Sequence, residues 1–403
     1  MKVFDLWRFC IAVSFAVALV RVSPIGGNDQ GVFWTLAQFA PIIIAALAAS
    51  FNAQRWYFNA VGWALLAWVI LALFSSIWSA FPTATLRQAS LLALVFGFLI
   101  VTSSTRWLER SVLIGDLKFF YWLIASAMIV GLLLIWFIDP AALMWRHSHY
   151  QGVFPNPNST ALLAAQAMAI GIWLLIVDER ISNRLAVFAS MFAIVATITA
   201  TCSRGPRAVL LIGIMVALWF SPYRRRALCY AAGIVVLIVT FPNLLLGRFC
   251  FRTGTDGSDF TSGRIGIWEF SLNLWQENPI LGAGYRTFEL IPASHGYTAH
   301  NIYLSILAEL GVVGLFMLLV VFVIIVVSGI KSSVKTDRML LGVIVVILAS
   351  GMTEAYLFGF GGTNSMITWL ILIAFAALGR ERQAVSEARE ATTFSLNFFR
   401  HGR

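Results

Sequence analysis

Residues 303–329 read YLSILAELGVVGLFMLLVVFVIIVVSG, and Glu309 is the one charged side chain in this run. An α-helix rises 1.5 Å per residue, so about 20 apolar residues cross the hydrocarbon core of a membrane, which is about 30 Å thick. The run is therefore long enough to span a bilayer. It predicts a transmembrane helix, and a membrane protein is the fold class to test along the rest of the chain.

The composition of the whole chain agrees with a membrane protein. Of its 403 residues, 60% are hydrophobic and 11% are charged, whereas soluble domains are roughly 25% charged. The alternation of apolar and polar residues that marks an outer-membrane barrel is absent from the sequence. We expect an all-α, polytopic transmembrane helical bundle of about twelve spans. The spans are placed at about 4–21, 31–51, 56–77, 86–104, 117–138, 160–177, 186–202, 207–221, 227–246, 303–329, 339–356 and 364–379.

The basic residues indicate how the bundle is oriented. With twelve spans, 19 of the 28 Lys and Arg residues fall on the side of the N-terminus and 9 fall on the other side. Cytoplasmic loops carry the excess of Lys and Arg, so we expect both termini in the cytoplasm. The net charge of +10 follows from these loop residues and does not indicate a nucleic-acid partner. The first helix lacks a small-residue cleavage site and is expected to be retained.

Two segments on the outer side are longer than the turns that join most spans. Residues 139–159 are rich in Pro and Asn and are expected to re-enter the membrane or to lie flat on it. Residues 247–300, between spans nine and ten, form a long periplasmic loop, and loops of that length are usually functional. Residues 1–379 are expected to form one transmembrane domain, followed by a charged cytoplasmic tail at 380–403.

The chain lacks the common metal and cofactor motifs. Its four cysteines, at 10, 202, 229 and 250, show no CxxC or CxxH spacing, which predicts neither a metal site nor a disulfide framework. No DxD, HExxH, GxSxG or Walker sequence is present. We therefore expect no metal and no cofactor, and a reaction that relies on arginine to bind phosphate and on histidine to transfer a proton.

Arg204 and Arg207 lie in TCSRGPRAVLL, between two apolar spans that are joined by almost no loop. Ionisable groups at such a depth cost roughly 2.5–3.5 kcal/mol on insertion scales and indicate a function. A guanidinium binds phosphate through a bidentate fork, and Gly205-Pro206 opens a helix whose N–H groups also favour an anion. Both arginines are candidates for binding phosphate. The alternative is that they extend to lipid headgroups at the membrane surface.

The outer loop contains another candidate arginine. Residues 264–275 have an amphipathic pattern, and the predicted helix would lie against the bilayer and present Arg264 to a lipid diphosphate. The alternative is a helix that only anchors the loop in the membrane interface and leaves Arg264 solvated. The apolar stripe of this predicted helix consists of Ile265, Trp268, Leu272 and Trp275.

His300 lies where the outer loop returns to the membrane, with Asn301 beside it. The ordinary pKa of a histidine side chain, about 6.5, suits a general base near neutral pH, although a histidine at a helix start is often only a cap or a surface residue. Glu309 lies on nearly the opposite face of the same predicted helix. We therefore expect no pair between His300 and Glu309, and we expect Glu309 to contact an arginine of another helix.

Four segments of the chain together resemble the superfamily of O-antigen ligases and polysaccharide polymerases. They are SSIWSAFPTATLRQ at 75–88, CSRGPR at 202–207, GRIGIWEFSLNLWQENPILGAGY at 263–285 and HNIYLSILAELGVVG at 300–314. Their order and spacing are similar to those of the superfamily across roughly residues 60–380. The resemblance implies a metal-independent glycosyltransferase in the bacterial inner membrane. Its donor would be a glycan on undecaprenyl diphosphate, used on the periplasmic face.

The resemblance also implies roles for individual residues. Arg204 and Arg264 correspond to the arginines that bind the diphosphate, and His300 corresponds to the histidine that activates the acceptor hydroxyl. The implied reaction is a single displacement with inversion, in which the arginines stabilise the leaving diphosphate. For Tyr285, the alternative that we favour is a position in the membrane interface. Further candidate contacts to phosphate or sugar are Arg207, Arg87, Arg146, Asn301 and Tyr285.

The acceptor separates the members of this superfamily. A ligase transfers the glycan to lipid A–core, whereas a polymerase joins lipid-linked repeat units to each other, and we favour the ligase. A flippase for the same lipids is a rival, but its basic residues should spread through several spans rather than gather on one side. A peptidoglycan polymerase would need an acidic residue in the outer loop, such as Asp256 or Asp259. Membrane lipids are the remaining expected partners.

Overall fold

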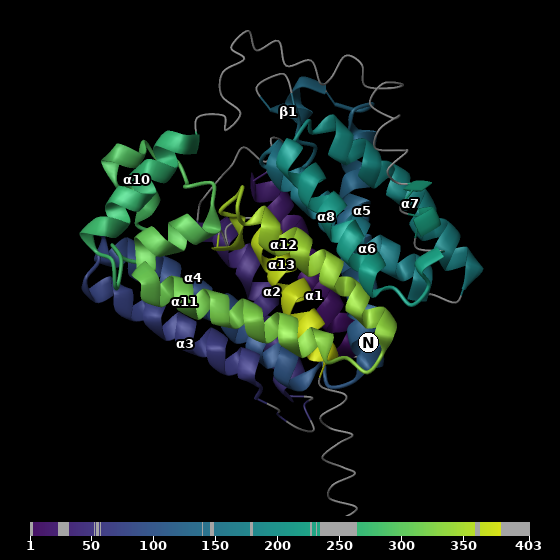
Figure 1. Cartoon of the computed structure of the whole chain (residues 1–403), viewed down its shortest axis with the longest axis horizontal. Coiled ribbons are helices and arrows are strands. Elements are labelled where there is room, and N and C mark those ends of the chain that lie inside the picture. The colour runs from purple at the N-terminus through teal and green to yellow at the C-terminus, as the bar shows by residue number, and fades with distance from the viewer. Residues whose placement is uncertain are drawn as a thin grey trace, which may run out of the picture.

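Helices account for nearly all of the secondary structure in the computed structural model (Figure 1). The structure describes residues 3–22, 32–51, 53, 56, 58–138, 140–145, 149–177, 180–225, 228–230, 232–233, 264–358 and 363–379. The α-helices are α1 (Val3–Val22), α2 (Val32–Phe51), α3 (Ala60–Phe74), α4 (Pro82–Thr105), α5 (Arg110–Leu134), α6 (Pro157–Val177), α7 (Ile181–Ala200), α8 (Arg204–Phe220), α10 (Arg264–Glu277), α11 (Ile302–Ile330), α12 (Leu341–Ser350) and α13 (Thr363–Leu378).

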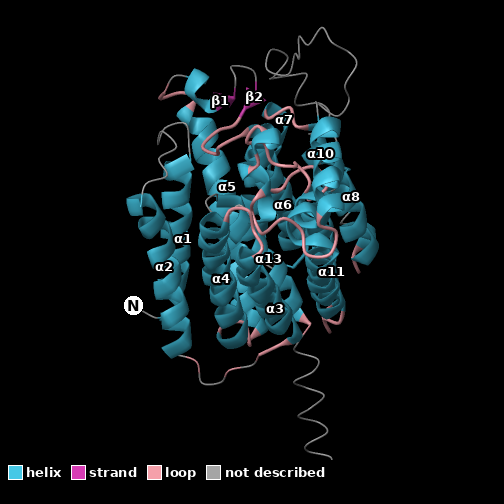
Figure 2. Cartoon of the chain, turned by 90° about the vertical axis from the view of Figure 1, so that its left-hand side faces the viewer, coloured by secondary structure: helices cyan, strands magenta, loops and turns pink. Residues whose placement is uncertain are grey.

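Short elements join these helices. A two-stranded antiparallel hairpin pairs β1 (Met144–Trp145) with β2 (His149–Tyr150), and Figure 2 shows it at one end of the bundle, above the long helices. The 3-10 turns are η1 (Ser75–Ile77), η2 (Pro140–Leu143), η3 (Phe288–Leu290), η4 (Pro292–Ser294), η5 (Lys335–Leu340) and η6 (Tyr356–Phe358).

Seven of the described helices are long and apolar enough to cross a membrane. They are α2 to α7 and α11, while α1 and α13 contain the shorter apolar stretches Leu6–Val20 and Asn364–Leu378. The prediction of an all-α, polytopic membrane protein is confirmed. The number of spans stays a prediction, because the predicted span at 227–246 falls largely outside the described residues, as do most of the loop before residue 264 and the tail at 380–403.

The predicted span at 339–356 is too long. Helix α12 ends at Ser350, and residues 351–353 form a turn. The carbonyl of Gly351 at this end accepts a hydrogen bond of 2.7 Å from the backbone N–H of Ile302, the first residue of α11. A helix end leaves carbonyl groups without partners inside the helix, so this contact satisfies one of them and brings the end of α12 to the start of α11.

Helices α6 and α13 form the centre of the bundle. In α6, 89% of the apolar window is buried inside the protein, compared with 22% in α2. Helix α13 packs against α4 and α11, between which Figure 2 shows it. The outer helices keep large apolar side chains exposed, as expected for faces that contact lipid tails. Examples of these exposed side chains are Trp63, Met215 and Phe316.

Two buried aspartates join helices at the end of the bundle where α4 and α11 end. Asp116 accepts hydrogen bonds from Arg8, Arg106 and Trp107 at 2.7–2.9 Å. Asp337 binds the Nε and Nη2 atoms of Arg110 at 2.9 and 2.7 Å. Both aspartate side chains are fully buried. These ion pairs connect α1 and α5 to neighbouring segments. Their arginines are among those that the distribution of Lys and Arg predicts on the cytoplasmic side.

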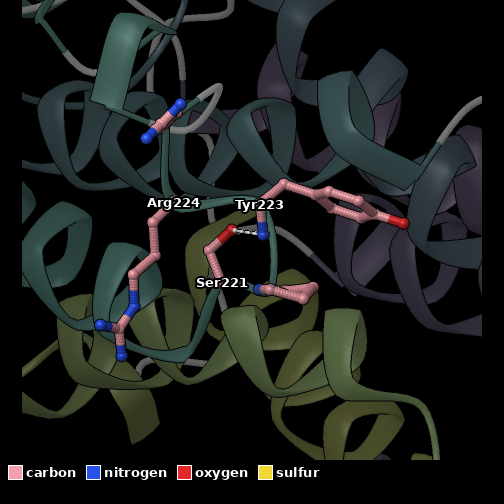
Figure 3. A pocket seen from close by; sticks show the side chains of 5 residues that line it. Ser221, Tyr223 and Arg224 are labelled. Carbon is pink, nitrogen blue, oxygen red and sulfur yellow. Dashed lines mark hydrogen bonds between the residues drawn. The ribbon is translucent and has the colours of Figure 1, made fainter.

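Two hollows also lie at this end. One, of about 570 Å³, follows the end of α8, and Figure 3 shows the side chains of Tyr223 and Arg224 pointing to different sides of it. The other, of about 430 Å³, lies between the start of α3 and the end of α11 and is lined in part by Asn59 and Lys331. No carboxylate or histidine lines either hollow, so acid–base chemistry has to be sought at the other end of the bundle.

Candidate active site

Glu354 lies at the centre of a polar cluster at that other end. It follows the turn at the end of α12, and its carboxylate binds side chains from three other segments. Oε2 is 3.1 Å from Nδ1 of His300. Oε1 accepts hydrogen bonds from Nη2 of Arg264 at 3.0 Å and from Nδ2 of Asn158 at 2.5 Å. The structure therefore brings together two residues singled out from the sequence, Arg264 and His300.

Further polar contacts hold this cluster in place. Nη1 of Arg264 donates to the carbonyl of Thr353 at 2.6 Å, so one guanidinium binds two consecutive residues of the turn. Oγ of Ser203 donates to Oδ1 of Asn158 at 2.8 Å, which joins the start of α8 to the start of α6. The bond between Asn158 and Glu354 connects residues 196 positions apart in the sequence. The cluster exists only because the folded bundle brings these segments together.

Four helices begin at this cluster, namely α6 at Pro157, α8 at Arg204, α10 at Arg264 and α11 at Ile302. The N–H groups of a first helical turn lack partners inside the helix and carry partial positive charge. Ser203 is the N-cap residue of α8, but its hydroxyl bonds to Asn158 and does not cap the helix. These helix starts add partial positive charge beside the cluster, which suits an anion such as a phosphate.

Arg204 adds a charge to the same place. It is the first residue of α8 and is exposed, and its guanidinium makes no hydrogen bond or ion pair within the described part of the chain. The next residue, Gly205, packs against the turn that precedes Glu354. A Cβ atom on Gly205 would lie 3.3 Å from Oγ1 of Thr353. Arg204 thus begins beside the cluster and has all of its donors available for a ligand.

The cluster can be reached from outside the protein. The exposed fractions of its side chains are 33% for His300, 22% for Arg264 and 14% for Glu354. Partial burial strengthens an ion pair relative to one at the surface. Arg264 has five N–H donors, and the contacts to Thr353 and Glu354 occupy two of them. The same guanidinium is therefore held in place and still able to bind another anion.

The backbone is strained at two positions beside the cluster. His300 has φ 46° and Cys202 has φ 55°, values in the left-handed region that residues other than glycine rarely adopt. Such a conformation costs on the order of 1–3 kcal/mol, and strained residues gather at functional sites. Cys202 also forms a disulfide bond, which corrects the expectation that the cysteines form none. Cysteines distant in sequence pair through the fold, so their spacing carried no signal.

Two predicted substrate contacts, Arg207 and Asn301, bind backbone groups of the protein, and their roles toward a substrate stay predictions. Nη2 of Arg207 donates to the carbonyl of Thr199 at 2.7 Å, and its buried Nε has no partner among the described residues. Its guanidinium thus packs against α7 and not at the cluster. Asn301 is the N-cap residue of α11, and its Oδ1 accepts from the backbone N–H groups of Tyr303 and Leu304 at 3.0 and 3.1 Å.

Two of the remaining candidates, Arg87 and Tyr285, make no contact with the cluster within the described part of the chain. Arg87 is exposed in the second turn of α4, and Arg146 lies outside the described residues. Tyr285 is fully buried. Its ring packs edge-on against Trp68, with the centroids 5.7 Å apart. The side chain therefore lies in the core of the bundle and not in the membrane interface, and its contact to a sugar stays a prediction.

The loop after α10 is fastened to a break in α11. Gly311 interrupts this helix with φ 63°. On one side of the break, Val312 donates to the carbonyl of Pro279 at 3.0 Å, and on the other the carbonyl of Glu309 accepts from Gly284 at 2.8 Å. The loop backbone thus supplies partners for groups that the interrupted helix cannot pair. This junction fixes the loop between Arg264 and His300 against the bundle.

Side chains reinforce the same junction. Oε2 of Glu309 accepts a hydrogen bond of 2.9 Å from the backbone N–H of Arg286. The expected contact of Glu309 with an arginine is therefore made to a loop backbone and not to a side chain of another helix. Oγ of Ser75 accepts from the backbone N–H of Tyr285 at 3.0 Å. The segment at 75–88 therefore meets the glycine-containing segment at 282–285.

Helix α10 forms where the sequence predicts a helix, and part of its predicted apolar stripe is exposed. Ile265 and Leu272 of the predicted apolar stripe are 51% and 38% exposed. The buried residues Ser271 and Leu274 lie on the packed face, which contacts a small apolar cluster near the start of α11. Apolar residues occur on both faces, so the periodicity did not identify the buried one. The exposed face is available to the membrane interface.

A comparison with protein families covers most of this cluster. Residues 188–319 match the family model described as O-antigen ligase. This region is similar to O-antigen ligases. It contains Arg204, Arg264 and His300, whereas Asn158 and Glu354 lie outside the matched residues. The match confirms the resemblance to O-antigen ligases and polysaccharide polymerases. A comparison with curated proteins finds no match.

Sequence reasoning missed Glu354 and Asn158, although each carries a signal. Glu354 lies within the predicted span 339–356, and an ionisable residue inside a span indicates a functional site, as it does for Arg204. Asn158 lies in PNPNST directly before an apolar run, where a polar residue is expected at a helix start. Within the matched residues 188–319, the motifs singled out the arginines and the histidine as candidates. Their shared carboxylate comes from a distant part of the chain.

Proposed function

We propose that the protein is an inverting, metal-independent glycosyltransferase that moves a glycan from undecaprenyl diphosphate to lipid A–core. The match of residues 188–319 to the O-antigen ligase family supports an enzyme of the ligase and polymerase type in general. One observation carries the specific reaction. His300 and Arg264 share Glu354 at a place where four helices begin, and Arg204 begins α8 beside them. A base for a hydroxyl and positive charge for a diphosphate thus lie together.

The diphosphate of the donor binds at Arg204, Arg264 and the N–H groups of the adjoining helix starts. A guanidinium matches the geometry of phosphate oxygens through two parallel hydrogen bonds. Arg264 keeps three of its donors available beyond its contacts to the turn. Because these groups are already in place, they stabilise the charge that develops on the leaving diphosphate without reorganising.

His300 activates the acceptor. Its Nδ1 is bound by Glu354, so its Nε2 removes the proton of the acceptor hydroxyl as the oxygen attacks the anomeric carbon. The new C–O bond forms on the face opposite the diphosphate, and the bond between the anomeric carbon and the diphosphate oxygen breaks. The electron pair of that bond stays with undecaprenyl diphosphate, and the configuration at the anomeric carbon inverts.

The site is proposed to face the periplasm of a bacterium, in its inner membrane, with both termini in the cytoplasm. The excess of Lys and Arg at the opposite end of the helices supports this orientation. The disulfide at Cys202, immediately before α8, supports it independently. Disulfides persist in oxidising compartments such as the periplasm and are rare in the cytoplasm.

The test is transfer by the purified protein from an undecaprenyl-diphosphate-linked oligosaccharide, with a metal chelator present throughout. Lipid A–core and a second lipid-linked repeat unit are offered as acceptors in separate reactions. We expect product on lipid A–core and inversion at the anomeric carbon. A ladder of lengthening glycans would instead establish a polymerase. Movement of the donor across a vesicle membrane without product would contradict the transferase and support a flippase.

A further inference from the structure

The two oxygens of Glu354 have different surroundings. On the Oε1 side lie two hydrogen-bond donors, Nη2 of Arg264 and Nδ2 of Asn158. On the Oε2 side lies the imidazole of His300. An arginine donates only, so the Oε1 side of this position requires an acceptor in every state of the site.

The second donor, Asn158, is also fixed in orientation. The two ends of an asparagine amide are told apart by their partners. The carboxylate of Glu354 only accepts, so the Nδ2 end of Asn158 faces it, and Oδ1 at the other end accepts from the hydroxyl of Ser203 at 2.8 Å. The chain of bonds from Ser203 through Asn158 to Glu354 therefore has one direction, and it begins immediately before Arg204.

The ionised carboxylate determines where His300 carries its proton. A carboxylate accepts hydrogen bonds and cannot donate one. The contact of 3.1 Å between Oε2 and Nδ1 of His300 therefore places the proton of a neutral imidazole on Nδ1. The lone pair then lies on Nε2, which is the form of the ring that removes a proton from a hydroxyl.

We propose that Glu354 is a positioning residue that holds His300 in its basic tautomer and, through its other oxygen, holds Arg264 beside it. This inference rests on the proposed transfer reaction and adds a residue to it. One carboxylate thereby sets the distance between the base and an arginine that binds the diphosphate. The acceptor hydroxyl and the leaving group must be aligned on opposite sides of one carbon, so a fixed distance between these two groups favours the reaction.

The hydrogen-bond partners of Glu354 predict which of two substitutions at this position lowers the activity more. In Glu354→Gln, the amide oxygen has to face Arg264 and Asn158, because both donate. The amide nitrogen then faces His300 and donates to Nδ1, which moves the ring proton to Nε2 and removes the base. Glu354→Asp keeps an acceptor-only carboxylate. We therefore expect the shape-conserving glutamine variant to be less active than the shorter aspartate variant.

The experiment measures kcat and KM for the donor in the transfer assay. For Glu354→Gln we expect kcat to fall on the order of 10⁴-fold, the size known for a catalytic histidine held in the wrong tautomer. KM for the donor should change less than about threefold, since the amide oxygen still holds Arg264. The matched control is Glu289→Gln, which breaks the 2.8 Å ion pair to Arg286 in the same outer loop and should leave kcat unchanged.

A double variant separates positioning from a merely structural role. Arg264 and Asn158 meet the same oxygen of Glu354, so in Asn158→Asp a carboxylate stands beside Arg264 and can accept from it in place of residue 354. In Glu354→Gln with Asn158→Asp, the amide can therefore turn its nitrogen toward the new carboxylate at position 158 and offer its oxygen to His300. We expect kcat to rise at least tenfold over Glu354→Gln alone. Wild-type kcat in Glu354→Gln, or no recovery in the folded double variant, would overturn the positioning role. An inactive wild-type protein would instead contradict the transfer reaction itself.

Discussion

Replacing Arg264 by lysine keeps a positive charge at the cluster but removes the planar fork. In the structure, Nη1 binds the carbonyl of Thr353 at 2.6 Å and Nη2 binds Glu354 at 3.0 Å, which leaves three of the five donors available. A lysine ammonium is a single point of charge. It cannot hold both groups of the turn and also bind two phosphate oxygens in the geometry of a guanidinium.

The size of the effect follows from the contacts that are lost. A hydrogen bond to a charged group contributes about 1.5–3 kcal/mol. Loss of one such bond to the diphosphate in Arg264→Lys lowers kcat/KM by about ten- to 150-fold. Because the arginine contacts both the bound donor and the leaving group, we expect KM for the donor to rise and kcat to fall together.

The assay compares initial rates of glycan transfer over a range of donor concentrations. The matched control is Arg286→Lys, because Arg286 lies in the same outer loop and its guanidinium pairs with Glu289 at 2.8 Å. We expect the control to stay within about threefold of the wild-type protein, since a lysine can retain a single ion pair. Activity of Arg264→Lys at the level of this control would refute the phosphate-binding role and leave Arg264 as an anchor.

Three further outcomes are expected. Arg204→Ala and His300→Ala each abolish transfer without lowering the thermal unfolding temperature in detergent, and substantial activity in either variant would remove its assigned role. At Gly311, φ is 63° and an added Cβ would clash with the carbonyl oxygen of Ile280, so Gly311→Ala destabilises the protein by about 1–3 kcal/mol. An unchanged unfolding temperature would contradict this. Asp116→Ala leaves two arginines facing a vacated, fully buried site and costs about 3–5 kcal/mol, measured by the same melt.

The positions of most helices could be predicted from the sequence. Apolar runs fixed the class of the protein because every backbone N–H and C=O inside a membrane needs a partner, which a helix supplies locally. The start of α8 was also readable, since proline is tolerated in a first helical turn and Gly205-Pro206 follows Arg204. The end of α12 was misplaced, because Thr353 and Glu354 interrupt an otherwise apolar segment only briefly.

Tertiary packing decided which face of each segment points inward. The apolar residues of α10 lie on both faces, and contacts with the start of α11 selected the face that includes Leu274. Tyr285 shows the same limit. An amphipathic side chain next to Gly284 suited a sugar site or a membrane interface, and only the packing against Trp68 shows that it belongs to the core.

By itself, the sequence determined a helical membrane protein, and it singled out Arg204, Arg264 and His300 as candidates to bind phosphate and to move a proton. The tertiary structure decided that Glu354 joins Arg264 to His300 and that Asn158 orients Glu354 from 196 residues away. The physical reason is the distance along the sequence over which the interactions act. Helix formation depends on neighbours within a few residues, whereas a pair between helices depends on how whole segments pack.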